Sequence, residues 1–197
     1  MQSLARDPPY LIERIIMSSD TPPVIGFICG SLREGSINKR LEKALVKRFK
    51  RAGLKTTSIN LGTYDLPLYH GHLDMPAGVK KLARKIKSCD GVVIVSPEYN
   101  GGLPPLLKNA IDWTSTTGKA HFESPYWGIA SCTPGPMSGI MCMRQVNYIL
   151  MRLGAHVSPI QVGVGRAQVA FDSKGELIAE PSASLADNLI NDMLNHL

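Results

Sequence analysis

From Val24 onward, the chain alternates short apolar runs with segments whose apolar positions recur every three or four residues. The short runs predict buried strands, and the wider spacing predicts helices that pack along one face. The predicted strands span residues 24–29, 55–61, 91–95, 126–131 and 156–162, and the predicted helices span residues 37–52, 79–86, 103–115, 139–153 and 185–197. This alternation indicates an α/β fold with a doubly wound parallel sheet covered by helices on both faces.

The loop after the first predicted strand combines two glycines with several small or charged polar side chains. Within Gly30–Asn38, the hydroxyl groups of Ser31 and Ser36 stand beside Arg33 and Asn38. Free N–H groups at a helix start favour an anion, and a guanidinium adds a charged donor, so a phosphate is the expected ligand. Helix capping by Ser36 is the plainer alternative, but capping does not account for the other three polar side chains.

The loop after the third predicted strand, Ser96–Gly102, is a second candidate for ligand binding. Ligands of doubly wound sheets bind beyond the carboxyl ends of the strands, where this loop lies. Pro97 fixes the turn, and we expect the N–H groups of residues 98–102 to face outward and bind a flat heteroaromatic ring. Tyr99 would shield that ring or contact another subunit. The alternative is an ordinary turn of Pro, Asn and Gly residues.

These two loops resemble the signatures of NAD(P)H-dependent FMN reductases. Gly30-Ser-Leu-Arg-Glu-Gly-Ser-Ile-Asn38 is similar to the phosphate loop G-S-x-R-x-x-S-x-N of that family, and Ser96-Pro-Glu-Tyr-Asn100 followed by Leu107–Trp113 is similar to its second signature. The strongest resemblance is to the quinone and chromate reductase branch. It implies a flavodoxin-like fold, with a five-stranded parallel sheet in the order 2-1-3-4-5 and bound FMN.

The resemblance also implies which residues form the site. The FMN phosphate would be held by Ser31, Arg33, Ser36, Ile37 and Asn38, and the isoalloxazine ring would be lined by Pro97, Glu98, Tyr99, Asn100 and Gly101. The loop near Ser131 would complete the site. There the sequence departs from the family, because Thr133–Gly139 is shorter than the usual Gly-rich stretch and contains two prolines. Pro105 also replaces a common glycine. Both differences bear on the nicotinamide side and on the choice of acceptor.

The expected function follows from this resemblance. NADH or NADPH would reduce the FMN, and a small-molecule acceptor (a quinone, a flavin or an oxyanion such as chromate) would then reoxidise it in a ping-pong reaction. No catalytic side chain is required, and we expect His70, His72, His121 and His156 to be surface or loop residues. The alternative is a flavodoxin-type electron carrier that does not itself oxidise NAD(P)H. Such carriers are typically acidic, whereas this chain has a net charge of +6.

Composition and charge bear on whether the protein binds membranes or nucleic acids. No apolar run approaches the roughly 20 residues that span a bilayer, so no membrane partner is expected. The chain shows no nucleic-acid module, so no nucleic acid is expected either. The basic stretches at 39–55 and 80–87 are either solvated helix faces or attract an anionic ligand.

The four cysteines show no C-x-x-C or zinc spacing, which predicts buried thiols, no metal site and a reducing cytoplasm. The family resemblance implies a homodimer or homotetramer. Residues 1–22 are predicted to be a flexible leader before one FMN-binding domain at 23–197, and Met17 is a second candidate start beside Met1.

Overall fold

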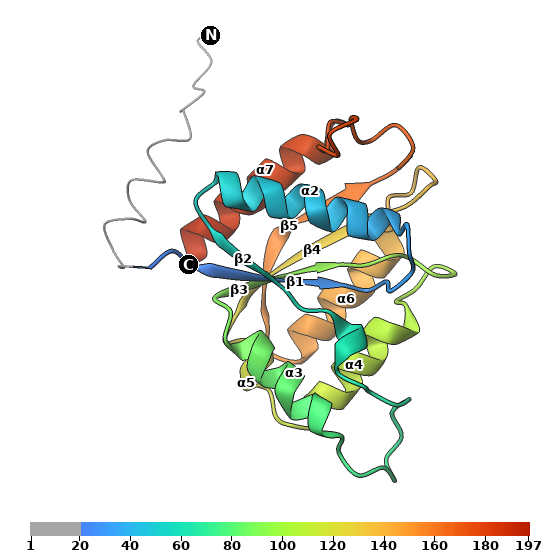
Figure 1. Cartoon of the computed structure of the whole chain (residues 1–197), viewed down its shortest axis with the longest axis vertical. Coiled ribbons are helices and arrows are strands. Elements are labelled where there is room, and N and C mark those ends of the chain that lie inside the picture. The colour runs from blue at the N-terminus through green and yellow to red at the C-terminus, as the bar shows by residue number, and fades with distance from the viewer. Residues whose placement is uncertain (1–20) are drawn as a thin grey trace.

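A five-stranded parallel sheet forms the centre of the computed structural model, which describes residues 21–197 (Figure 1). The strand order is β2-β1-β3-β4-β5, which confirms the predicted flavodoxin-like topology. The strands are β1 (Val24–Cys29), β2 (Lys55–Ser58), β3 (Gly91–Val95), β4 (Tyr126–Cys132) and β5 (His156–Val164). The predicted leader lies outside the described residues except for its last two positions, as does Met17.

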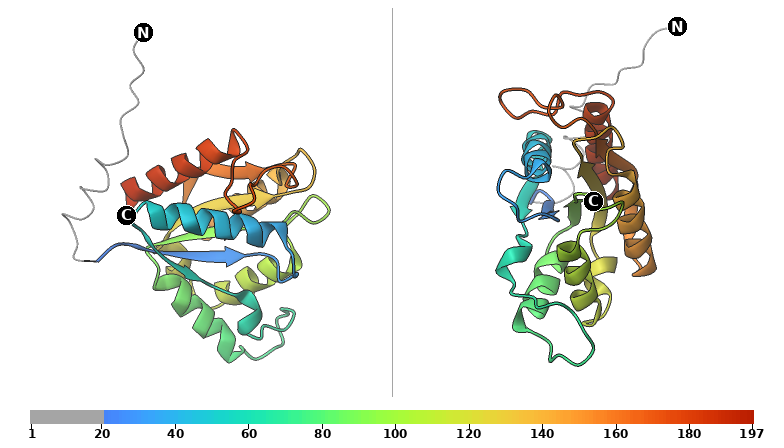
Figure 2. Two further views of the ribbon diagram at one scale, coloured as in Figure 1. Left: turned by 45° about the horizontal axis from the view of Figure 1, so that its top comes forward. Right: turned by 90° about the vertical axis from the view of Figure 1, so that its right-hand side faces the viewer.

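Helices cover both faces of the sheet (Figures 1 and 2). One face packs against α2 (Ile37–Arg51) and α7 (Ser182–His196). The other face packs against α3 (Ala77–Lys87), α4 (Pro105–Ser115), the short α5 (Ala120–Glu123) and α6 (Ile140–Arg152). None of the helices in residues 21–197 combines the length and the apolarity needed to span a bilayer.

Successive side chains of each strand point to opposite faces of the sheet, so the apolar side chains of the strands form two cores. In β3, Val93 and Val95 face the α2–α7 core, whereas Val92 and Ile94 face the core on the other side. All five residues of β3 are buried, as expected for a central strand covered on both faces. This burial explains why the sequence shows a continuous apolar run there.

The structure corrects two predicted elements. The second strand ends at Ser58 rather than at residue 61, because the Oδ1 atom of Asn60 accepts the N–H of Gly62 and begins the 3₁₀ turn η1 (Leu61–Thr63). Helix α5 was not predicted, since four residues are too few to show a helical period.

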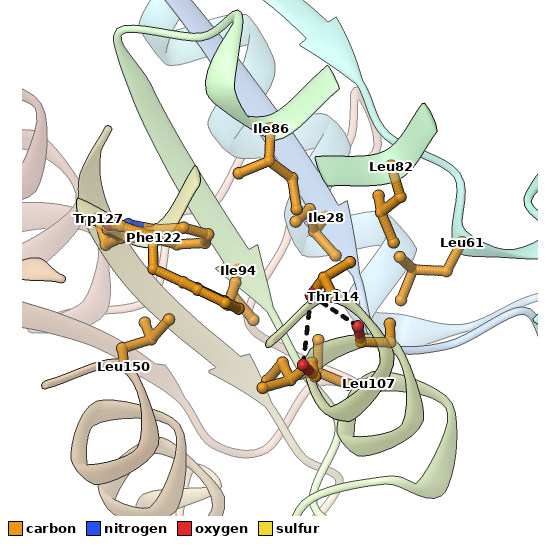
Figure 3. Close-up of a pocket in the computed structure, with 12 residues that line it drawn as sticks. Ile28, Leu61, Leu82, Ile86, Ile94, Leu107, Thr114, Phe122, Trp127 and Leu150 are labelled. Atoms are coloured by element: carbon orange, nitrogen blue, oxygen red, sulfur yellow. Dashed lines mark hydrogen bonds between the residues drawn. The ribbon is translucent and has the colours of Figure 1, made fainter. Parts of the chain in front are cut away.

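The core beneath α3, α4 and α6 contains a small cavity of about 10 Å³, which is room for about one water molecule (Figure 3). Its lining is apolar apart from Thr114. The hydroxyl group of Thr114 donates to the carbonyl of Ala110, one turn earlier in the same helix, at 2.8 Å. No polar group is therefore left to orient a ligand, and the cavity is a packing defect rather than a binding site.

Candidate functional site

The two predicted ligand loops adjoin each other at the carboxyl edge of the sheet. Gly30 continues the β1–β3 pairing through a bond from its N–H to the carbonyl of Val95, at 2.9 Å. A Cβ atom on Gly30 would lie 3.0 Å from Ser96 Oγ and 3.2 Å from Pro97 Cδ, closer than most real Cβ contacts. The absence of a side chain at Gly30 therefore lets the first loop pack closely against the second.

The first loop presents donors that fit a phosphate group. Ser36 caps α2, and its Oγ accepts the N–H of Lys39 at 3.4 Å. Within residues 21–197, the N–H groups of Ile37 and Asn38 have no hydrogen-bond partner, and the exposed guanidinium of Arg33 has neither a hydrogen bond nor an ion pair. No acidic side chain occupies the first turn of α2. The helix start is therefore free to bind an anion.

The side chain of Asn38 is used differently from the rest of the loop. It is 1% exposed. Its Nδ2 donates to the carbonyl of Cys132 at 2.8 Å, and its Oδ1 accepts the N–H of Cys132 at 2.9 Å. Both polar atoms of this carboxamide are therefore used to join α2 to β4. Only the backbone N–H of Asn38 is left for the phosphate role that the family resemblance implies.

The second loop closes as a tight turn. Tyr99 and Gly102 exchange two backbone hydrogen bonds of 3.0 Å, and Asn100 and Gly101 between them have φ values of 51° and 74°. Positive φ at both central positions is the geometry of a type I′ turn. The expectation that every N–H group of residues 98–102 faces outward is therefore wrong for Tyr99 and Gly102, whose donors are used within the turn. The N–H groups of Glu98, Asn100 and Gly101 have no partner among the described residues.

Glu98 anchors this loop to α6. Its Oε2 atom accepts the N–H groups of Met141 and Cys142, each at 3.0 Å. The N-cap residue of α6 is Gly139, which has no side chain to cap the helix. The carboxylate of Glu98 therefore satisfies two otherwise free donors and interacts favourably with the positive end of the helix. Glu98 thus contributes its side chain to the scaffold and its N–H to the candidate ring site.

Gln145 makes a second contact between α6 and this loop, and sequence reasoning missed it. Its Oε1 accepts the N–H of Leu103 at 3.0 Å, and its Nε2 donates to the carbonyl of Gly101 at 3.4 Å. Gln145 stands four residues after Met141 and three after Cys142, on the helix side that meets the loop. Only the three-dimensional arrangement of the loop and α6 reveals this role.

The third loop, Thr133–Gly139, lies over the end of β4. Gly139 has a φ of 71°, and a Cβ atom at that position would collide with Ser131 Oγ. Ser131 is fully buried, and its hydroxyl oxygen has no hydrogen-bond partner among the described residues. The structure therefore places Ser131 beneath this loop, and its role in completing a flavin site stays a prediction.

A further cation stands at the same edge and was not singled out from the sequence. Arg166 follows β5 with a φ of 49°, and its N–H donates to the carbonyl of Gly135 at 3.0 Å. Its side chain is exposed and forms no hydrogen bond or ion pair within residues 21–197. Arg166 therefore belongs to the surroundings of the third loop. One indication of this position is present in the sequence, since Arg166 directly follows Gly163-Val-Gly165 at the end of a predicted strand.

Part of the basic stretch at 39–55 serves the fold. Arg48 donates to the carbonyl of Leu177 at 2.7 Å, and Arg51 pairs with Glu176 at 2.8 Å. Lys47 donates to the carbonyl of Lys174 at 2.8 Å. The outer face of α2 thus holds the chain segment between β5 and α7. If this stretch attracts anions, its basic residues without such contacts are the ones available to do so.

The histidines and cysteines correspond to the predictions with one exception. His70, His72 and His156 are exposed, whereas His121 is 3% exposed and burial lowers its pKa to about 4. The prediction that His121 is a surface or loop residue is therefore wrong, because α5 folds its ring against Phe122 in the core.

All four cysteines are buried and free. Burial raises the pKa of Cys29 and of Cys142 to about 11, so both stay thiols at neutral pH. In the part of the chain that the structure describes, no three metal-ligating side chains gather at one place.

The comparison with known proteins agrees with this geometry. The family model described as NADPH-dependent FMN reductase matches residues 23–169. The chain belongs to this family. Among its relatives, a quinone reductase of Escherichia coli (strain K12) is 36% identical over 134 residues, covering 66% of this chain and 70% of that protein. An NAD(P)H-dependent FMN reductase of Pseudomonas aeruginosa is 30% identical over 175 residues, covering 85% and 90%.

A solved structure shows the same fold. FerB, an NAD(P)H:(acceptor) oxidoreductase from Paracoccus denitrificans, superposes with a TM-score of 0.76 at 25% identity, covering 88% of this chain and 96% of that one. Family membership confirms that the protein is an oxidoreductase with FMN as cofactor and a nicotinamide electron donor. The donors of the first two loops fit this cofactor, since one set suits a phosphate and the other a ring with polar edges.

Proposed function

We propose that this protein is a cytoplasmic NAD(P)H:quinone oxidoreductase that works through bound FMN, with flavins and oxyanions such as chromate as further acceptors. The observation that carries the proposal is the contact at Gly30, which holds the phosphate-binding and ring-binding loops against each other. Unused backbone donors on both loops would then bind one ligand. The similarity to quinone reductases supports quinones as the main acceptors.

The first loop would bind the phosphate of FMN. The N–H groups of Ile37 and Asn38 would donate to its oxygens, together with the hydroxyl groups of Ser31 and Ser36. The guanidinium of Arg33 would add charge-assisted hydrogen bonds from the solvent side. Because the helix start is already formed and free of acidic side chains, the phosphate would bind without displacing a protein contact.

The second loop would bind the ring. When bound, FMN supplies hydride acceptance and electron transfer, which no amino-acid side chain provides. The N–H groups of Glu98, Asn100 and Gly101 would donate to polar atoms of the ring and stabilise the negative charge that reduction leaves there. The tight turn and Pro97 fix these donors before the ligand arrives. Tyr99, which is 47% exposed, would cover the edge of the ring.

The chain needs no acid or base of its own for this reaction. The carboxylate of Glu98 is held by two N–H groups of α6, and burial keeps the thiol of Cys142 protonated. The donor and the acceptor would bind in turn over the same open side of the ring, which gives ping-pong kinetics. The protein would act by binding, orienting and stabilising charge.

The proposed assembly is a homodimer or homotetramer. Met141, Tyr148 and Met151 lie along the outer side of α6 and are 45%, 68% and 62% exposed. Such an apolar stripe on a surface helix supports contact with a second copy. Light scattering coupled to size-exclusion chromatography measures the mass in solution, and a monomer at all concentrations would contradict this assembly.

Steady-state kinetics test the proposed function. The purified protein, saturated with FMN, is expected to consume NADH or NADPH continuously when a benzoquinone is present. Double-reciprocal plots at several quinone concentrations should give parallel lines, the pattern of a ping-pong reaction. A flavodoxin-type carrier would bind FMN and leave NAD(P)H unoxidised, and that result would refute the proposal. Intersecting lines would refute the ping-pong order alone.

A further inference from the structure

Exposed apolar side chains lie beside unpaired cations on one part of the surface. The apolar side chains belong to the connection between η1 and α3, residues 64–76, and the cations belong to α3. We call this region the loop–α3 surface, and it consists of Leu68, Tyr69, Leu73, Met75, Lys80, Lys81, Arg84 and Lys87. None of these residues belongs to the candidate flavin site.

Two side chains of α4 hold the loop of residues 64–76 by hydrogen bonds. The carboxamide of Asn109 accepts the N–H of Tyr69 at 2.8 Å and donates to the carbonyl of Pro67 at 2.9 Å. The Nε1 atom of Trp113 donates to the same carbonyl at 2.6 Å, and the rings of Tyr69 and Trp113 pack edge to face at 5.0 Å. The loop is therefore held on both sides of Leu68, whose side chain points into solvent and is 78% exposed.

Apolar side chains held outward in this way retain an unfavourable contact with water. Leu73 and Met75 are also exposed, at 39% and 38%. Removing such side chains from water is favourable by about 25 cal/mol per Å² of apolar surface. Grouped apolar exposure on an ordered loop is typical of a surface that contacts a partner.

Helix α3 supplies the charge. Its inner side is the buried apolar stripe Val79, Leu82, Ala83 and Ile86, so its five basic residues lie outside that stripe. None of them forms an ion pair with any residue from 21 to 197, in contrast to the basic residues of α2. Asp65 and Asp74 of the loop offset only part of this charge, and His70 and His72 between them are exposed. The surface is cationic on balance.

The loop and the helix form one continuous surface. Met75 stands two residues before α3, and a Cβ atom on Gly78 would overlap the carbonyl of Tyr64, so the first turn of α3 packs against the start of the loop. Figure 1 shows the loop and α3 together along the lower side of the molecule, next to α4. Apolar contacts and cations can therefore meet the same partner.

We propose that the loop–α3 surface docks the protein on an anionic lipid bilayer. The apolar side chains would enter the boundary between headgroups and acyl chains, and the cations of α3 would contact anionic headgroups. The expectation of no membrane partner rests on the lack of a spanning segment, and peripheral docking needs none. This inference goes beyond the proposed function and does not depend on which acceptor the flavin reduces.

Vesicle sedimentation tests the proposal on the full chain loaded with FMN. Vesicles of phosphatidylcholine with about one third phosphatidylglycerol should bind the protein at low salt, and vesicles of phosphatidylcholine alone should not. Replacing Lys80, Lys81 and Arg84 by Ser should lower the partition coefficient on the order of a hundredfold. A matched triple replacement of exposed cations elsewhere, at Lys50, Arg152 and Lys174, should lower it much less.

A second pair of variants tests the apolar contact. Leu68→Ser with Leu73→Ser should weaken binding, whereas Val169→Ser with Ile178→Ser, at exposed apolar positions between β5 and α7, should not. Circular dichroism and flavin absorbance check that each variant folds. The proposal is overturned if anionic vesicles bind no protein, or if matched variants lose binding equally. It is also overturned if the surface binds transfer RNA but not vesicles, or if the leucine pair changes only the oligomeric state.

Discussion

The carboxamide of Asn38 and the peptide of Cys132 share two hydrogen bonds, 2.8 and 2.9 Å long, which join the start of α2 to the end of β4. Both partners are buried, so water cannot replace either bond. The start of α2 is also the proposed phosphate site. The position of that helix end, and with it the proposed phosphate site, therefore depends on a contact with β4. This strand lies two positions from β1, the strand that precedes α2.

Asn38→Ala should destabilise the protein even without flavin. The substitution leaves the N–H and the carbonyl of Cys132 buried without these partners, which costs about 2–4 kcal/mol of unfolding free energy. FMN affinity should fall with it. Urea unfolding of the apoprotein measures the effect, with Asn147→Ala on α6 as the control. Unchanged apoprotein stability would show that the contact is dispensable.

Arg33→Ala should weaken FMN binding and leave folding unchanged. Its side chain has no partner within residues 21–197, so only the ligand contact is lost. Loss of a charge-assisted bond corresponds to about 1.5–3 kcal/mol, or roughly ten- to a hundredfold in affinity. Titration of apoprotein with FMN measures it, and Lys50→Ala serves as the control. Equal affinity in the two variants would remove Arg33 from the site.

Glu98→Gln should change both stability and the flavin potential. The neutral amide interacts less with the start of α6, so the unfolding free energy should fall by about 1 kcal/mol. Removing a negative charge near the ring should favour the reduced flavin and shift its midpoint potential to more positive values. Spectroelectrochemical titration measures that shift. If Glu34→Gln in the first loop produced the same shift, the assigned position of Glu98 would be wrong.

The rate of flavin reduction should depend on salt through the cations at the sheet edge. Exposed charges attract NAD(P)H over a distance that shrinks to about 8 Å at physiological ionic strength. The second-order rate should therefore fall as salt rises, and Arg166→Ala should reduce that dependence. Hydride transfer at saturation should stay nearly constant. Stopped-flow reduction at several salt concentrations gives both rates, and a slope unaffected by the substitution would exclude Arg166 from steering.

Burial of His121 should make stability depend on pH. Its pKa is lowered from 6.5 to about 4, so between these values the unfolded chain binds a proton that the folded chain does not. Stability should therefore fall as the pH drops through this window, by on the order of 3 kcal/mol in total. His121→Phe should flatten the profile and His156→Asn should not. Equal urea midpoints for wild type and His121→Phe across the window would contradict this account.

The sequence predicted those parts of the fold that depend on local pattern. The apolar run of β3 and the spacing along α2 identify a strand and a helix without any tertiary information, and the first loop lies where the parallel sheet requires it. The end of β2 was predicted wrongly because Ile59 and Leu61 are buried outside the strand. Burial and strand pairing produce the same apolar signal in a sequence.

The contacts that organise the candidate site could not be predicted in this way. Glu98 and Gln145 both hold the second loop to α6, but they lie on different elements, and their bonds exist only after the sheet has formed. Nothing in the spacing of Asn38 shows that its carboxamide would be used by Cys132. Sequence motifs identify the residue types at a site, and the structure decides which of their atoms are still free.

The missing side chain at Gly30 lets the first and second loops, the proposed phosphate and ring sites, lie in close contact. If both loops bind the cofactor as proposed, a shift of one loop to suit a new substrate would also move the other. Variation in acceptor preference would then be expected in the third loop, Thr133–Gly139, which takes no part in this contact and contains two prolines. Directed evolution aimed at a new acceptor should find its productive substitutions in residues 133–139.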